Sequence, residues 1–227
     1  MIPVIYEDDH YIAVNKPHGL MIHKSALSRG VKEFLVNILE DQIGQKVYPV
    51  HRLDRKTSGV ILFAKSSEAT KLVGEQFQNK TTKKEYLAIV RGHFIERVMV
   101  TKALENDKGV IQEAETEFIC VSKSTIDIPV AKYPTARFSL VKCKPKTGRM
   151  HQIRKHLNHL RFPIIGDRPH GCNKNNKMLL EKFGLEKMML HAKELTFYHP
   201  FTKENITLNA ELSSEFNRML DELKLVK

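Results

Sequence analysis

The segment at residues 51–59 reads HRLDRKTSG and runs directly into the apolar sequence GVILFAK at residues 59–65. A turn-forming Thr-Ser-Gly group before a continuous apolar run predicts a tight turn that enters a buried strand. Asp54 stands between Arg52 and Arg55, two cations that favour the charged form of its carboxylate and that could also bind phosphates. These nine residues alone also fit a turn whose aspartate makes only structural ion pairs.

Other short apolar or alternating runs predict further strands. They fall at residues 11–15, 85–91, 137–143, 189–198 and 205–208. The run RFSLVKC at 137–143 alternates apolar and polar residues, which is the period of a half-buried strand.

Helical patterns separate some of these strands, at residues 31–43, 67–78, 150–160, 177–183 and 214–223. Ser66 is placed to cap the second helix, with Glu68 in its first turn where the helix dipole favours an anion. Strands outnumber helices and often follow one another directly, which predicts an α+β fold with a central, mainly antiparallel sheet flanked by helices. No repeat or linker divides the sequence, so we expect one catalytic domain over residues 1–227.

The charge balance favours a polyanionic partner. Lys and Arg number 37 against 26 Asp and Glu, which gives a net charge of +11 and a pI near 9.5. Neutralising phosphates releases counterions and attracts a nucleic acid over long range. A basic surface with no ligand is the alternative.

The cysteine spacing and the hydropathy pattern predict a cytoplasmic protein. Cys120, Cys143 and Cys172 are widely separated and odd in number, which is typical of reduced thiols and not of a disulfide framework or a zinc knuckle. The first residues carry acids where a signal peptide would carry bases, and no apolar run approaches the roughly 20 residues of a membrane-spanning helix.

Four further motifs follow a fixed order along the chain. They read NKP at residues 15–17, with Gly19, Leu20 and His23 after it, KEY at 84–86 before an apolar run that ends at Gly92, TGRMHQIR at 147–154, and LHA at 190–192. With the 51–59 segment, they resemble the RluA-type pseudouridine synthase family, whose first motif is H-R-L-D-x-x-T-S-G. The resemblance spans nearly the whole chain, and it implies the pseudouridine synthase catalytic fold without an S4 RNA-binding domain.

The reaction that the resemblance implies breaks the N1–C1′ bond of a uridine, turns the uracil and joins C5 to C1′. Nothing is oxidised or reduced, so we expect neither a cofactor nor a metal ion. The position of the family's catalytic aspartate is Asp54. A carboxylate there could act as a nucleophile at C1′ or as a base at C2′, and the sequence leaves both open.

The resemblance also implies two further catalytic residues. Tyr86 would stack on the extruded uracil and handle a proton at C5; the alternative is an aromatic residue packed in the core. Arg154 would be the cation that pairs with Asp54 in a dry pocket; the alternative is a solvated helix arginine. Arg149 is the other possible partner of Asp54, or a phosphate contact.

Four more residues are expected to bind the RNA. Arg52 would insert where the flipped nucleotide leaves the stack, and Leu190 would line the other face of the uracil pocket. Arg55 and His51 would contact the substrate beside Asp54. The histidines lack the spacing of a metal site, so no metal ligand is expected.

Within the family, the sequence is most similar to the branch that modifies uridine 65 of tRNA. The similarity rests on DQIGQ at residues 41–45 and on IGDRPHG at 165–171, followed by an Asn-rich stretch and KFGLEKMMLHA. Lys56 departs from that branch, which has proline there, and residues 102–132 are the least recognisable part. We expect a monomer that recognises tRNA architecture with little base reading.

Three rival hypotheses remain open. The same enzyme could act on ribosomal RNA. The fold could be a non-catalytic RNA-binding module, although Asp54, Tyr86 and Arg154 are all present. A nuclease built on Asp54 and several histidines would cleave the strand and need a metal ion.

Overall fold

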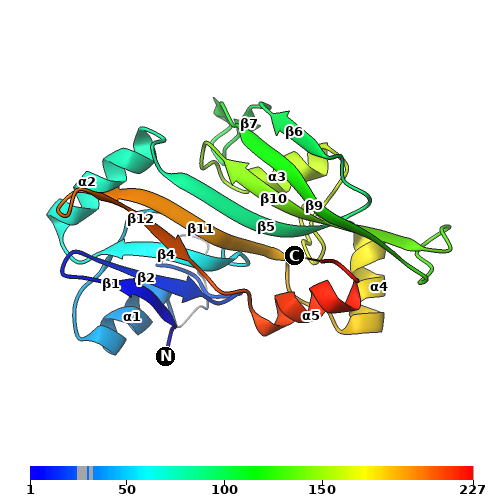
Figure 1. Ribbon diagram of the computed structural model, residues 1–227, viewed down its shortest axis with the longest axis horizontal. Coiled ribbons are helices and arrows are strands. Elements are labelled where there is room, and N and C mark those ends of the chain that lie inside the picture. The colour runs from blue at the N-terminus through cyan, green and yellow to red at the C-terminus, as the bar shows by residue number, and fades with distance from the viewer. Residues whose placement is uncertain (25–29, 31–32, 227) are drawn as a thin grey trace. The chain divides into compact units, whose positions relative to one another are not determined.

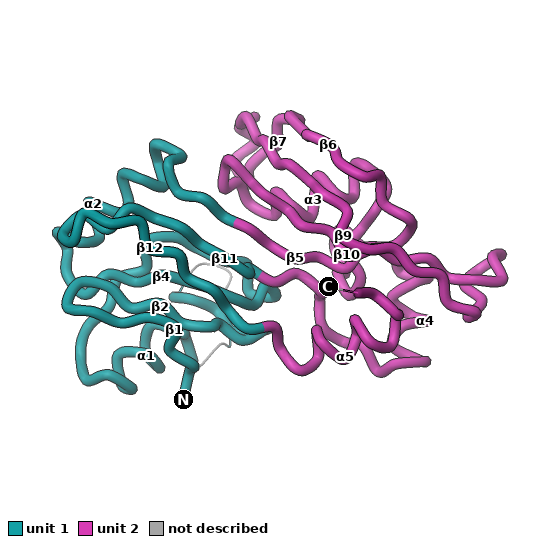
Figure 2. Tube along the Cα trace, in the orientation of Figure 1, with its two compact units in different colours: residues 1–84, 192–211 teal, residues 85–191, 212–227 magenta. Residues whose placement is uncertain are grey.

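The computed structural model describes residues 1–24, 30 and 33–226. The chain forms two compact units, each built from two segments (Figure 2). Unit 1 comprises Met1–Lys84 and Ala192–Glu211, and unit 2 comprises Glu85–His191 and Leu212–Lys227. The chain passes from one unit to the other within strands β5 (Lys83–Arg91) and β11 (Leu190–His199).

The strands of unit 1 surround β4 (Ser58–Ala64), in which every residue is buried. β4 pairs with β2 (Tyr11–Lys16) and with the short β3 (Tyr48–Pro49), both antiparallel, and it neighbours β11. The outer strands are β1 (Val4–Glu7), antiparallel to β2, and β12 (Glu204–Asn209), antiparallel to β11 (Figure 1). The predicted buried strand after the 51–59 segment is therefore confirmed as the centre of this unit.

The described residues of unit 1 include two helices. α2 (Ser67–Gln78) has the predicted bounds; the hydroxyl of Ser66 accepts a hydrogen bond from the Ala69 N–H at 3.1 Å, and Glu68 lies in the first turn. α1 (Leu35–Ile43) ends at Gly44, which has a left-handed conformation with φ 68°. The predicted helix began at residue 31, and residues 31 and 32 lie outside the described part of the chain.

Unit 2 contains four antiparallel strands in the order β5-β10-β9-β6. β10 spans Ala136–Pro145, β9 spans Thr116–Ile126 and β6 spans Arg97–Val100. A small hairpin of β7 (Leu104–Glu105) and β8 (Ile111–Gln112) stands apart from them. The predicted α+β class with a mainly antiparallel sheet is confirmed, and residues 102–132 supply three strands that were not predicted.

The unit 2 sheet buries a hydrophobic cluster on each face. One cluster joins the sheet to α4 (Asn173–Phe183) and α5 (Ser214–Glu222), and its members include Ile89, Phe138, Leu179, Phe216 and Leu220. The other joins it to α3 (Gln152–His159), and its members include Val90, Phe118, Val141, Ile153 and Leu157. Because side chains alternate along a strand, β5 sends Ile89 to the first cluster and its neighbours Ala88 and Val90 to the second.

No helix in the described part of the chain has the length and the apolar character needed to cross a membrane.

Candidate active site

Asp54 lies at the start of a tight turn that leads into the central strand of unit 1. The Thr57 N–H donates to the Asp54 carbonyl at 3.0 Å and closes this turn, and β4 begins one residue later. Gly59 has φ +108°, and a Cβ at this position would fall 2.2 Å from the Ala192 carbonyl oxygen. Only glycine allows β11 to approach so closely, which explains the last residue of the HRLDRKTSG segment.

The buried side chain of Lys16 holds the same turn through hydrogen bonds. The Lys16 ammonium donates to the carbonyls of Pro17 at 3.1 Å, Leu20 at 3.0 Å and Arg55 at 3.1 Å. The Gly19 N–H also donates to the Arg55 carbonyl, and Arg55 Nε donates to the Gly19 carbonyl, each at 2.9 Å. These bonds tie the residue next to Asp54 to the segment after β2, so the carboxylate stands on a rigid backbone.

The lysine is unusual because its side chain is fully buried. Burial lowers the pKa of Lys16 to about 7, although the negative charge of Asp54 opposes this change. Three carbonyl acceptors match the three N–H donors of an ammonium group. A structural role for Lys16 was not predicted from the sequence; the available signal was a lysine at the end of an apolar strand and directly before a proline.

His51 anchors the first residue of the motif inside unit 1. Its ring stacks on Phe77 with 4.8 Å between centroids, and its Nε2 accepts the Leu62 N–H at 3.0 Å. Burial, with the nearby charge of Lys84, lowers the pKa of His51 to about 3. These contacts give the neutral imidazole a structural task, and the RNA contact expected of His51 stays a prediction.

The two arginines that flank Asp54 are exposed. Arg55 donates its Nε–H to the Gly19 carbonyl, and Arg52 lies two residues before Asp54. Both are therefore accessible to phosphates from solvent, as an RNA contact requires.

Tyr86 and Leu190 belong to the α3-facing cluster of unit 2. Tyr86 pairs with Cys143 across the β5–β10 ladder and is half-buried at the edge of the cluster. Leu190, at the start of β11, is buried within it. Ile153 of α3 joins the same cluster, so the strands of both residues pack near the helix that carries Arg154.

Gln152 holds the TGR turn in front of α3. Its Oε1 accepts from the Thr147 hydroxyl at 2.7 Å and from the Arg149 N–H at 3.0 Å, and its Nε2 donates to the Glu115 carbonyl and to the Thr116 hydroxyl, each at 2.9 Å. The amide thereby satisfies four hydrogen bonds in a buried position. Arg149, predicted as a phosphate contact or as a partner of Asp54, donates from Nε to the Glu113 carbonyl at 3.0 Å.

Arg154 is buried and forms a two-pronged ion pair with Asp167. Nε lies 2.7 Å from Oδ2 and Nη2 lies 2.9 Å from Oδ1. This pairing uses two of the five N–H donors of the guanidinium and fixes its plane. The alternative of a solvated helix arginine is therefore wrong, because Arg154 is only 4% exposed.

Asp167 was not predicted as a site residue, although it belongs to the IGDRPHG segment that resembles the tRNA branch of the family. Its Oδ1 also accepts the His170 N–H at 3.3 Å, and the His170 ring lies beside His151, with 3.0 Å between Nε2 and Nδ1. Asp167 therefore links the helix of Arg154 to the loop at residues 166–172. The signal was an acid within a few residues of a predicted active-site helix.

Metal binding has no support in the described residues, which contain no group of three or more His, Cys, Asp or Glu side chains able to hold an ion. Cys120, Cys143 and Cys172 are free thiols.

Asp54 stands on a turn of unit 1, whereas Tyr86 and the buried guanidinium of Arg154 belong to unit 2. A family model described as RNA pseudouridylate synthase matches residues 10–159. The chain belongs to the RNA pseudouridylate synthase family, and its enzyme class is that of an RNA pseudouridine synthase. The predicted family is thereby confirmed.

Several individual proteins of this family are similar to the chain over nearly its whole length. The chain is 43% identical over 226 residues to tRNA pseudouridine synthase C of Pasteurella multocida, covering 95% of this chain and 93% of the relative. It is 40% identical over 232 residues to the protein of the same name from Vibrio vulnificus, covering 97% and 95%. A third, from Haemophilus influenzae, is 41% identical and covers 98% of each chain.

Solved structures agree on the fold. Human RNA Pseudouridylate Synthase Domain Containing 4 superposes with a TM-score of 0.76 at 24% identity, covering 99% of this chain and 94% of that one. Human RNA Pseudouridylate Synthase Domain Containing 1 gives 0.72 at 21% identity, covering 100% and 96%.

Proposed function

We propose that this protein converts a uridine of tRNA, uridine 65, to pseudouridine. The observation that carries the proposal is the Asp54 turn, held by Lys16 and Gly59, in a chain whose relatives at 40–43% identity are named tRNA pseudouridine synthase C. The position within tRNA rests on the sequence similarity to the branch that modifies it.

The proposed reaction needs an ionised Asp54 held at a fixed place. In the nucleophilic route, a carboxylate oxygen bonds to C1′ and the uracil leaves with the N1–C1′ electron pair. The uracil turns, C5 bonds to C1′, the carboxylate is released, and the proton on C5 passes to N1 through a base or water. In the alternative route, Asp54 removes the C2′ proton as the uracil leaves with the N1–C1′ electron pair, which gives a glycal with a C1′=C2′ double bond. After the uracil turns, C5 bonds to C1′, the proton returns to C2′, and the proton on C5 passes to N1. Both routes depend on positioning, which the rigid turn provides.

The other predicted residues keep their proposed roles. Tyr86 stacks on the uracil and its hydroxyl moves the C5 proton, while Leu190 covers the opposite face of the base. Arg154 provides the positive charge that pairs with the Asp54 carboxylate, and Asp167 orients that guanidinium. The residues that contact the RNA beside the flipped nucleotide are Arg52, Arg55, Arg149 and His51.

The substrate's stem must open before the reaction can start. Extruding a stacked uridine costs a few kcal/mol, which contacts to phosphates and stacking on Tyr86 must offset. A net charge of +11 supplies the attraction. We propose a single catalytic domain that works as a monomer in the cytoplasm and needs no cofactor.

The test is incubation of the purified protein with an unmodified tRNA transcript that carries 5-tritiated uridine. We expect tritium release, and mapping at nucleotide resolution should place one pseudouridine at position 65. Asp54→Asn, which keeps the shape of the side chain, should bind the same tRNA without releasing tritium. Modification of ribosomal RNA but not of tRNA would contradict the substrate, and full activity of Asp54→Asn would contradict the catalytic residue.

A further inference from the structure

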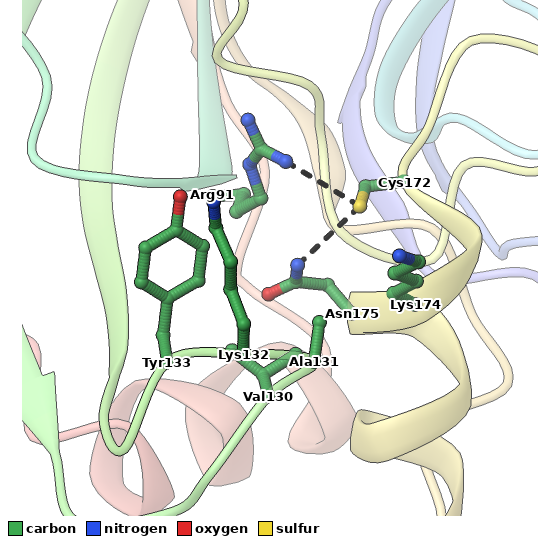
Figure 3. Close-up of a pocket in the computed structure, with 8 residues that line it drawn as sticks. All are labelled: Arg91, Val130, Ala131, Lys132, Tyr133, Cys172, Lys174 and Asn175. Atoms are coloured by element: carbon green, nitrogen blue, oxygen red, sulfur yellow. Dashed lines mark hydrogen bonds between the residues drawn. The ribbon is translucent and has the colours of Figure 1, made fainter.

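A cavity of about 480 Å³ opens in unit 2, on the sheet face that α4 covers. Its size lies within the roughly 300–1,000 Å³ of clefts that take small molecules, so it could hold a nucleotide. Arg91 enters from β5, Lys132 and Tyr133 from the 130–133 segment, and Lys174 from the first turn of α4 (Figure 3). Tyr86 faces the opposite cluster, so the cavity is separate from the catalytic residues predicted in this unit.

The cavity is strongly positive. Arg91, Lys132 and Lys174 line it, and no Asp or Glu is among the described lining residues. Burial opposes ionisation of the Cys172 thiol, but hydrogen bonds from Asn175 and Arg91 lower its pKa. Even with this thiolate, three cations face one anion, which leaves a net charge of +2.

The cations differ in mobility in a way that suits a phosphate. Arg91 is fixed, because Nη1 donates to Cys172 Sγ at 3.5 Å and Nη2 donates to the Arg161 carbonyl at 3.3 Å. Lys132 and Lys174 are exposed and can move to meet an anion. One fixed guanidinium with two mobile ammonium groups provides both a set geometry and adaptable charge.

An aromatic ring completes the wall. Tyr133 is 58% exposed, and the Lys132 ammonium lies 5.6 Å from the centre of its ring. Figure 3 shows these two side chains rising side by side from their segment toward Arg91. An exposed ring beside cations is the arrangement on which nucleic-acid-binding proteins stack a base while holding its phosphate.

We propose that this cavity is a second RNA-binding site, in which Arg91, Lys132 and Lys174 hold backbone phosphates and Tyr133 stacks on a nucleotide. The proposal rests on the assignment of RNA as substrate. The site adds affinity away from the chemistry, so it affects binding and leaves the chemical step unchanged.

The test compares two double variants that remove the same charge from unit 2. K132Q/K174Q removes both mobile cavity cations, and K177Q/K182Q removes two exposed lysines of α4 that do not line the cavity. Affinity is measured by filter binding, as a function of salt, for the unmodified tRNA transcript and for a plain RNA duplex. We expect K132Q/K174Q to raise Kd about tenfold or more and to lower the slope of log Kd against log salt by about two.

The control should change Kd less than threefold, and kcat of K132Q/K174Q at saturating tRNA should stay at the wild-type value. Tyr133→Ala should weaken binding further while Tyr133→Phe should not, because stacking needs the ring and not the hydroxyl. Equal losses in the two double variants, or unchanged affinity in both, would overturn the site. A wild-type protein that binds RNA but forms no pseudouridine would instead contradict the proposed function, and the comparison of variants would still decide the cavity.

Discussion

Arg154 and Asp167 form a buried, two-pronged ion pair in which the carboxylate meets Nε and Nη2 at 2.7 and 2.9 Å. The side chains are only 4% and 1% exposed, so neither charge can be compensated by water. The loop at residues 166–172 thereby determines how the guanidinium of the proposed active site is oriented.

Asp167→Asn should be strongly destabilising, because it removes the negative charge that lies 2.7 Å from a buried guanidinium. The expected loss is about 3–5 kcal/mol in the free energy of unfolding, measured with urea. Glu215→Gln is the control, since it removes a more exposed ion pair with Arg218 in the same unit, and it should cost less than about 1 kcal/mol. Similar losses in the two variants would show that the buried Arg154–Asp167 pair contributes no more to the free energy of unfolding than an exposed pair.

Lys16→Met should loosen the Asp54 turn. It removes the ammonium donor shared by the carbonyls of Pro17, Leu20 and Arg55. The Arg55 carbonyl keeps the Gly19 N–H, and loss of the other bonds in this partly buried network costs about 1–3 kcal/mol. We expect a loss of this size in unfolding and a lower kcat with tRNA. Lys46→Met, at an exposed position of the same unit, should change stability by less than about 0.5 kcal/mol. A Lys16→Met protein with wild-type kcat would show that the hydrogen bonds of Lys16 to the turn have no effect on catalysis.

Two glycine-to-alanine changes should alter the free energy of unfolding in opposite directions. Gly59→Ala places a methyl group 2.2 Å from a backbone oxygen at φ +108°, so β4 and β11 must separate. We expect a loss of more than about 2 kcal/mol. Gly74→Ala, in the middle of α2 with open space around it, should gain about 0.5–1 kcal/mol. Thermal unfolding of the two variants checks both signs, and a stable Gly59→Ala would refute the close approach to Ala192.

His51 should make stability depend on pH. Its pKa is lowered to about 3 in the folded protein, against 6.5 for an ordinary histidine, so the unfolded chain binds the proton more readily. This stability is present above pH 6.5 and is lost as the pH falls toward 3, by at most about 1.4 kcal/mol per pH unit. Urea unfolding between pH 4 and 8 should show a shallower dependence for His51→Gln, whose side chain does not titrate. Parallel curves would contradict the buried neutral imidazole.

The sequence predicted those features that depend on neighbouring residues. The 51–59 turn, the buried strand after it, and α2 with its Ser66 cap all follow from local patterns. The predicted helix at 150–160 begins instead at Gln152, because His151 has φ 56° and cannot continue the helix toward its N-terminus.

The missed features depend on partners that are distant in the sequence. β9 was not predicted, because Lys123 and its serine neighbours interrupt the apolar alternation, and pairing with β10 decides the strand. Lys16 and Asp167 gain their importance only through the Arg55 carbonyl and Arg154, which folding brings to them. Tertiary hydrogen bonds of this kind leave no periodic signal.

The contact of Gly59 with Ala192 has a consequence for biosynthesis. The Ala192 peptide group that packs against Gly59 leaves the ribosome only after most of unit 2 has been made. Until then, the turn that carries Asp54 leads into a strand that still lacks one neighbour. The turn that carries Asp54 should therefore reach its final packing only late in the maturation of the chain.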